Sequence, residues 1–91
     1  MPSDSLLESL QAAAPGWTRV RAMYERDRGA ERWRLIPESP GWCAEVRWTR
    51  GDAHRWSELR THDPHPQVAL LAVLEMRNAV EDYEKQRQPK P

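Results

Sequence analysis

The feature that most constrains this chain is the segment from Asp63 to Gln86, which predicts one long C-terminal helix. Asp63 is a good N-cap, and Pro64 suits the first helical position, where its missing N–H costs nothing. Apolar residues recur in this segment at helical spacing, and no glycine interrupts them. The predicted core stripe of the helix consists of Val68, Ala69, Ala72, Val73, Met76, Ala79, Val80 and Tyr83.

Three leucines, Leu70, Leu71 and Leu74, point away from this stripe and give the helix more apolar surface than one contact face requires. Burying each of them would contribute roughly 1.5 to 3 kcal/mol, so we expect something to cover them. There are three candidate covers: an N-terminal helix, a second copy of the chain, or a different protein. Cover from within the same chain is the usual solution.

A short helix is predicted near the N-terminus, where Ser5-Leu6-Leu7-Glu8 has the pattern of a capping box. Pro15-Gly16 ends this helix after about three turns. A helix of this length is marginal alone and must dock to persist, and the three leucines of the long helix offer it a surface. Its apolar side consists of Leu6, Leu7, Leu10, Ala13 and Ala14.

Residues 17–60 contain all five tryptophans and predict an antiparallel meander of three or four strands. The expected strands span residues 17–26, 31–36, 42–49 and 53–61, with glycine-containing turns between them. The third strand alternates most strictly and is expected at the centre, whereas the fourth has the weakest pattern. The face expected to pack against the long helix consists of Val20, Ala22, Tyr24, Trp33, Leu35, Trp42, Ala44, Val46 and Trp48.

The sequence therefore predicts one small α+β domain over residues 1–86, with the order α-β-β-β-β-α and a disordered tail at 87–91. As a topology, this order resembles the double-stranded-RNA-binding fold and the antitoxin domains that use the same sheet and helix plan. The RNA-binding family has a lysine cluster at the start of its last helix. This helix begins with His62-Asp63-Pro64-His65-Pro66-Gln67 instead, and no residue role is transferred from the resemblance.

Charge and cysteine content limit the function further. The formal net charge is zero, which excludes a strongly basic nucleic-acid-binding protein. Cys43 is the only cysteine, so no internal disulfide can form and a cytoplasmic location is expected. The N-terminus does not look like a secretion signal, and the longest apolar run, Val68–Leu74, is far shorter than the roughly 20 residues of a membrane-spanning helix. No membrane partner is expected.

The opposite face of the predicted sheet is rich in arginine. These side chains could follow a phosphate backbone, with Trp17 as a stacking platform for a base. Alternatively, Glu25 and Glu45 pair with them across the strands and leave a solvated face. Arginine also makes up twelve of the fourteen basic residues, which a GC-rich genome would explain. The arginines concerned are Arg19, Arg21, Arg32, Arg34 and Arg47.

Motifs for catalysis, cofactors or metals are sparse. Cys43 has no motif around it that would make it a nucleophile, and the four glycines are dispersed and form no phosphate loop. The stretch from His62 to His65 brings imidazole and carboxylate groups together but lacks a second pair of ligands. We therefore expect no enzyme, no cofactor and no metal site.

Two hypotheses about function follow. The first is a small non-enzymatic interaction module, such as an accessory, inhibitor or antitoxin-like protein of a bacterium or phage with a GC-rich genome. It would bind a different protein, or a second copy as a homodimer, through Leu70, Leu71, Leu74 and Trp56. The alternative is nucleic-acid binding through the arginine face.

Overall fold

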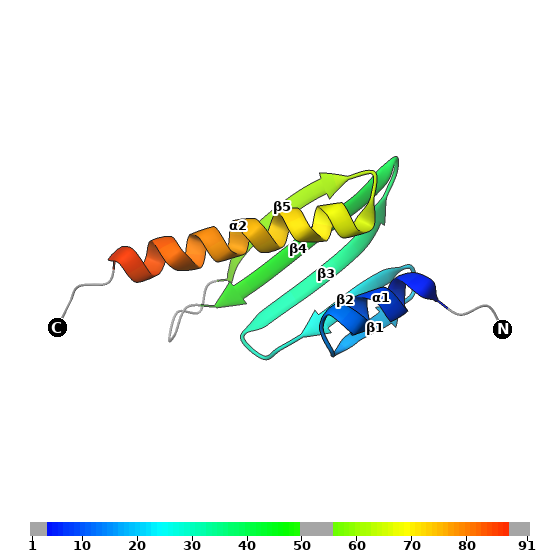
Figure 1. Ribbon diagram of the computed structural model, residues 1–91, viewed down its shortest axis with the longest axis horizontal. Helices are drawn as coiled ribbons and strands as arrows, with labels where there is room; N and C mark the ends of the chain where they lie inside the picture. Colours follow the sequence, from blue (N-terminus) through cyan, green and yellow to red (C-terminus); the bar gives the residue numbers. More distant parts are fainter. Residues whose placement is uncertain (1–3, 50–55, 88–91) are drawn as a thin grey trace.

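The computed structural model describes residues 4–49 and 56–87 and contains a five-stranded antiparallel sheet with two helices on one face (Figure 1). The strands lie in the sheet in chain order, β1-β2-β3-β4-β5. The predicted α+β class is confirmed, with one strand more than expected. The elements are α1 (Ser5–Ala13), β1 (Trp17–Val20), β2 (Met23–Asp27), β3 (Glu31–Glu38), β4 (Gly41–Thr49), β5 (Trp56–Asp63) and α2 (Pro66–Arg87).

The additional strand arises because the predicted first strand, residues 17–26, is in fact a hairpin. Val20 pairs with Met23, so Arg21 and Ala22 form a two-residue loop between β1 and β2. Arg21 has a φ of 60°, a left-handed conformation that glycine, Asn or Asp usually supplies in such loops. Because neither loop residue is a turn former, the sequence carries no signal for this hairpin.

Several element boundaries also differ from the predicted ones. β3 does not end before Pro37, because Pro37 still pairs with Trp42 of β4. Proline is tolerated there because β2 pairs with β3 only as far as Leu35, so the missing N–H disturbs no second ladder. β5 continues to Asp63, and α2 begins two residues later than predicted and extends to Arg87. The predicted turn at 51–52, the start of the fourth strand at 53–55 and the tail at 88–91 lie outside the described residues.

The core lies between the sheet and the two helices. Val20 and Ala22, which were expected in it, are exposed, and Trp17 is buried instead. The hairpin explains this exchange, because the loop at Arg21 turns Val20 toward the opposite face of the sheet. Trp42 is only half-buried. The buried hydrophobic cluster consists of Leu10, Trp17, Tyr24, Trp33, Leu35, Ala44, Val46, Trp48, Ala69 and Val73.

α2 packs on the sheet through a narrower stripe than the one predicted. Ala69 and Val73 are completely buried, whereas Val68, Met76 and Tyr83 of the predicted stripe are exposed. Successive residues of an α-helix are rotated by about 100°, and this rotation places Val68 and Met76 on the flank of α2 rather than against the sheet. The last turns of α2 extend beyond the end of the sheet (Figure 1).

Polar contacts explain the rotation of α2. The Thr61 hydroxyl donates a hydrogen bond to the carbonyl oxygen of Ala69, which holds the first turns close to β5. Farther along, the Arg77 guanidinium lies 4.1 Å from the centre of the Trp48 ring, and its Nε is 3.4 Å from Glu31 Oε2. A helical wheel assigns arginine to solvent, but here it is part of the buried side of the helix.

Asp4 holds α1 on the sheet. Its Oδ1 accepts a hydrogen bond from the Leu7 N–H at 3.0 Å, its Oδ2 accepts one from the Tyr24 hydroxyl at 2.9 Å, and Arg19 Nη1 is 3.3 Å from the same oxygen. The capping-box pattern suggested Ser5 as the N-cap of α1, but the N-cap is Asp4. The Leu7 N–H lowers the pKa of Asp4, and burial raises the pKa of Tyr24.

Asp4→Ala should therefore release α1, whereas Ser5→Ala should leave it docked. The measurement is hydrogen exchange of the α1 amides, combined with the fluorescence of the buried Trp17. In the wild type, the contribution of Asp4 is complete above its ordinary pKa of 3.8 and is lost as the pH falls through its lower folded value. Equal exchange rates in the two variants would show that Asp4 does not anchor the helix.

Candidate protein-interaction site

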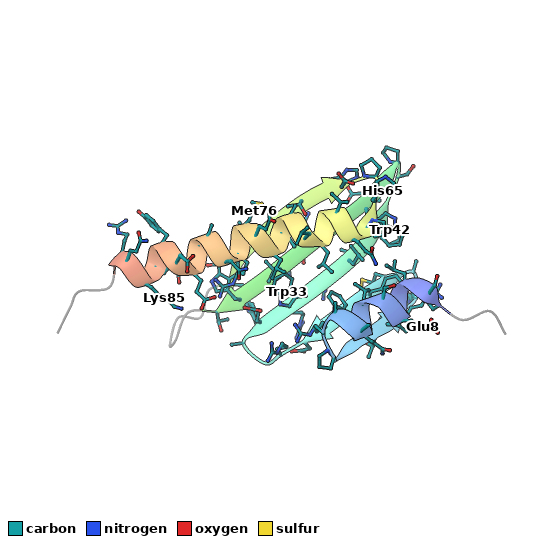
Figure 2. The ribbon with its side chains drawn as sticks, viewed as in Figure 1. Glu8, Trp33, Trp42, His65, Met76 and Lys85 are labelled. Atoms are coloured by element: carbon teal, nitrogen blue, oxygen red, sulfur yellow. The ribbon has the colours of Figure 1, made fainter. Side chains whose placement is uncertain are left out.

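An apolar groove separates α1 from α2 on the helical face of the sheet. It encloses about 170 Å³. The Trp33 side chain projects into this space between the two helices (Figure 2). Five elements and the segment after α1 contribute side chains, so the groove exists only in the folded protein. Its lining residues are Leu10, Ala13, Ala14, Trp17, Arg26, Trp33, Leu70 and Leu74.

Polar contacts fix the walls of the groove. Arg26 Nε donates to the carbonyl oxygen of Pro15 at 2.8 Å, which ties the end of α1 to β2. The Trp33 indole N–H donates to Glu31 Oε1 at 2.7 Å and so has a fixed orientation. Burial, followed by repulsion from Arg28, lowers the pKa of Arg26 below its ordinary value, yet a guanidinium stays charged at neutral pH. The groove therefore has apolar walls with one cation among them.

The structure places the three predicted leucines at different depths. Leu70 is half-buried and packs against the core, whereas Leu74 is 40% exposed and Leu71 is 55% exposed. α1 was one of the three candidate covers for these leucines, but it lies over β1, and the groove separates its Leu10 from α2. Leu74 therefore lines an open groove, and Leu71 lies exposed beyond it.

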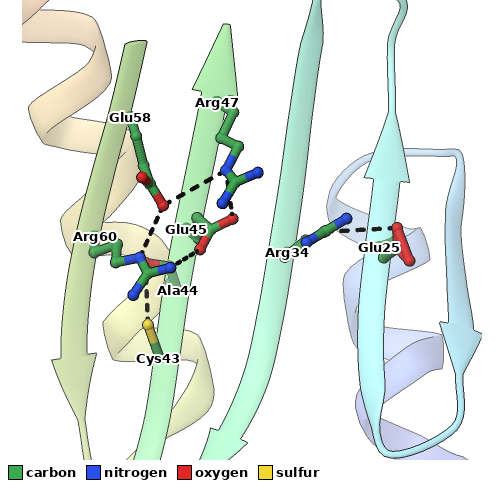
Figure 3. A network of polar contacts seen from close by, with 8 residues as sticks. All are labelled: Glu25, Arg34, Cys43, Ala44, Glu45, Arg47, Glu58 and Arg60. Carbon is green, nitrogen blue, oxygen red and sulfur yellow. Dashed lines mark hydrogen bonds and ion pairs between the residues drawn. The ribbon is translucent and has the colours of Figure 1, made fainter. Parts of the chain in front are cut away.

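The opposite face of the sheet carries charged side chains of both signs, joined by ion pairs (Figure 3). Arg34 is paired with Glu25, with Nε 3.7 Å from Oε2, and Arg32 is paired with Asp27 at 3.3 Å. Glu25 and Glu45 are the acids whose pairing with arginine was the alternative to phosphate binding, and Asp27 and Glu58 form further ion pairs. The ion-paired side chains on this face are Glu25, Asp27, Glu45, Glu58, Arg32, Arg34, Arg47 and Arg60.

The centre of this face is Glu45, which is only 2% exposed although no helix covers it. Its carboxylate lies 3.1 Å from Arg47 Nε and 2.9 Å from Arg60 Nη2. Glu58 joins both arginines, and the hydrogen bond from Arg60 Nε lowers the pKa of Glu58. Arg60 and Glu58 were not singled out from the sequence, because they are in the strand with the weakest alternation. Their positions opposite Glu45 and Arg47 in the β4–β5 register bring them into the cluster.

Arg19, Arg21 and Trp17 do not belong to this face, contrary to the sequence-based expectation. Arg19 projects to the helical side, where it pairs with Asp4, and Arg21 is in the β1–β2 loop. Trp17 is buried in the core and presents no free ring to a base. The unpredicted hairpin explains all three differences. Arg32, Arg34 and Arg47 are engaged with acids, so nucleic-acid binding stays a prediction that this geometry does not support.

Cys43 and the His62–His65 segment have local structural contacts. Burial raises the pKa of the Cys43 thiol, which disfavours the reactive thiolate. His62 Nε2 lies 3.1 Å from the carbonyl oxygen of Glu38, and Asp63 Oδ2 accepts the His65 N–H at 2.8 Å. Over residues 4–49 and 56–87, His, Cys, Asp and Glu side chains form no group of three or more that could hold a metal ion.

Trp56, the fourth predicted partner-binding residue, is at the first position of β5 and is half exposed. It is far from the groove in the sheet order, because Trp17, Trp33 and Arg26 are in β1 to β3. The sequence-based set therefore divides between two surfaces, one between the helices and one at the β5 edge.

Within the described part of the chain, neither helix combines the length and hydropathy needed to cross a bilayer. Comparison with models of known protein families, with curated proteins and with solved structures found no match.

Proposed function

We propose that this chain is a small non-enzymatic interaction module, of the accessory, inhibitor or antitoxin-like kind, which binds a protein partner through its helical face. The observation that supports this most is the exposure of Leu71 and Leu74 beside an open apolar groove. Exposed apolar surface that continues into a groove is typical of protein contact sites. Leaving these leucines in water forgoes the stabilisation that burial would give.

The shape of the groove favours an amphipathic segment as the bound element. Its two side walls are helices, and its floor contains Trp33 and Arg26. A partner helix lying in it would insert apolar side chains spaced by three and four residues, as in other helix-in-groove complexes. Arg26 adds charge selectivity, because it would attract a carboxylate carried beside those apolar residues.

Glutamate substitutions at the groove test this function. Leu74→Glu should leave the fold intact and weaken partner binding at least about tenfold, since it places a charge among apolar contacts. Asn78→Glu is the matched control, because it adds the same charge one turn farther along an exposed part of α2. Both variants and the wild type would be used, with a tag, to isolate partners from the native host, followed by reconstitution of the complex from purified proteins.

Two results would contradict the proposal. If Leu71→Glu and Leu74→Glu unfold the chain, the leucines belong to the core and are not a contact surface. If both variants fold and retain every partner of the wild type, the groove is not the binding site.

A further inference from the structure

The outer edge of β5 is open to pairing with another strand. All eight residues of β5 pair with β4 in one unbroken register, and none of the described strands pairs with its other side. Natural edge strands are usually protected by proline, charged side chains (lysine above all), a bulge, short length or a covering element. β5 has no proline, lysine or bulge and is eight residues long, and its charged residues Glu58 and Arg60 have opposite signs, whereas the opposite edge, β1, is only four residues long.

α2 adds an apolar flank beside this edge. Leu70 and Leu74 face the groove and thus α1, so residues on the other side of Ala69 and Val73 face away from α1, toward β5. Met76 lies on this side in the structure (Figure 2). The flank consists of Val68, Ala72 and Met76 and continues through Ala79 to Tyr83, where α2 extends beyond the sheet (Figure 1); Val68, Met76 and Tyr83 are large and exposed.

The side chains of β5 are complementary to those of a second β5 in one antiparallel register. Two antiparallel copies of β5 place their helices on the same face of the joined sheet only in registers where one residue lies opposite the same residue of the other copy. With Leu59 opposite Leu59, Glu58 of each copy lies opposite Arg60 of the other, and Trp56 lies opposite His62. Moving the centre to Glu58 or to Arg60 would place like charges opposite each other, which is unfavourable.

We propose that this chain forms a two-fold dimer in which the β5 strands of two copies pair antiparallel with Leu59 at the axis. An axis perpendicular to the sheet yields one continuous ten-stranded sheet with all four helices on the same face. The two α2 helices then run antiparallel, and the apolar flanks beside the β5 edges face each other. The pairs between Glu58 and Arg60 also connect the ion pairs around Glu45 in one copy with those around Glu45 in the other. This dimer uses neither wall of the groove and does not depend on the proposed function.

Charge exchange tests the register directly. The wild type should have twice the 10.6 kDa chain mass by light scattering. Glu58→Arg and Arg60→Glu should each weaken dimerisation by about tenfold or more, because each places two pairs of like charges across the axis. An equimolar mixture of the two variants should recover a heterodimer, detectable by native mass spectrometry, because opposite charges then lie across the axis again. Glu8→Arg, an exposed change in α1 at the opposite end of the sheet order, is the control for charge alone.

Hydrogen exchange of the wild type provides a measurement that needs no variant. Dilution should speed exchange in β5 and reduce protection of the apolar flank of α2, while α1 stays unchanged. A monomer at every concentration, a dimer unaffected by Glu58→Arg and Arg60→Glu, or dilution effects confined to α1 and the groove would each overturn the β5 dimer. None of these results contradicts a binding role for the groove, and the last would agree with self-association through it.

Discussion

Replacing Val73 with Asp is expected to unfold the domain, whereas Met76→Asp is expected to leave it folded. Val73 is 0% exposed and Met76 is 41% exposed, although both belong to the core stripe predicted from helical spacing. A carboxylate buried at position 73 without a partner costs roughly 3 to 5 kcal/mol. The free energy of unfolding of a domain of this size is about 5 to 14 kcal/mol, so this loss removes a large part of it.

Urea denaturation followed by circular dichroism measures both variants of α2. Met76→Asp should change the free energy of unfolding by less than about 1 kcal/mol, because its side chain remains in water. Equal losses in the two variants would mean that α2 lies on the sheet through the stripe that the sequence predicts. Met76→Asp should also weaken the proposed dimer, so the comparison is best made at the lowest measurable protein concentration.

Leu35→Ala is expected to lower the free energy of unfolding by about 2 to 5 kcal/mol, whereas Leu71→Ala is expected to change it by less than about 0.5 kcal/mol. The two substitutions remove the same atoms, but Leu35 is completely buried in β3 and Leu71 is 55% exposed on α2. The first leaves a cavity in the middle of the core, whereas the second leaves none. The difference between the two values therefore measures how far Leu71 is free of the core.

Thermal and urea unfolding of the two alanine variants would be compared with that of the wild type. A loss near 2 kcal/mol for Leu71→Ala would show that Leu71 is already buried in solution. That result would remove the strongest support for the groove as a contact surface. A small loss for Leu35→Ala would instead contradict the central position of β3 in the core.

Glu45 is a charged residue that the sequence pattern predicts to be exposed but that is buried in the folded sheet. Strict alternation along β4 assigns Glu45 to solvent, and its orientation away from the helices agrees with that. Its burial comes from Arg47 and from Arg60, which lies directly opposite it on β5. Sequence alone cannot supply this register, because β5 has the weakest alternation and a short charged strand does not select one offset over its neighbours.

Local patterns in the sequence were sufficient for the α+β class, for both helices and for β3 and β4. Their alternation and capping signals act over a few residues, and Trp33, Leu35, Val46 and Trp48 are buried as this alternation requires. The β1–β2 hairpin was missed because Arg21 adopts a left-handed conformation without a residue that favours it. Its consequences include the burial of Trp17 and the loss of Arg19 from the arginine face.

Local sequence patterns are enough to specify which segments are helical or extended, and they show that α2 has more apolar surface than one face can bury. Which part of that surface stays exposed depends on contacts that form only in the folded chain. Thr61 and the stacking of Arg77 on Trp48 set the rotation of α2, and Asp4 sets the position of α1. These contacts join residues far apart in the chain, so no local period encodes them, yet they leave Leu71 and Leu74 beside an open groove.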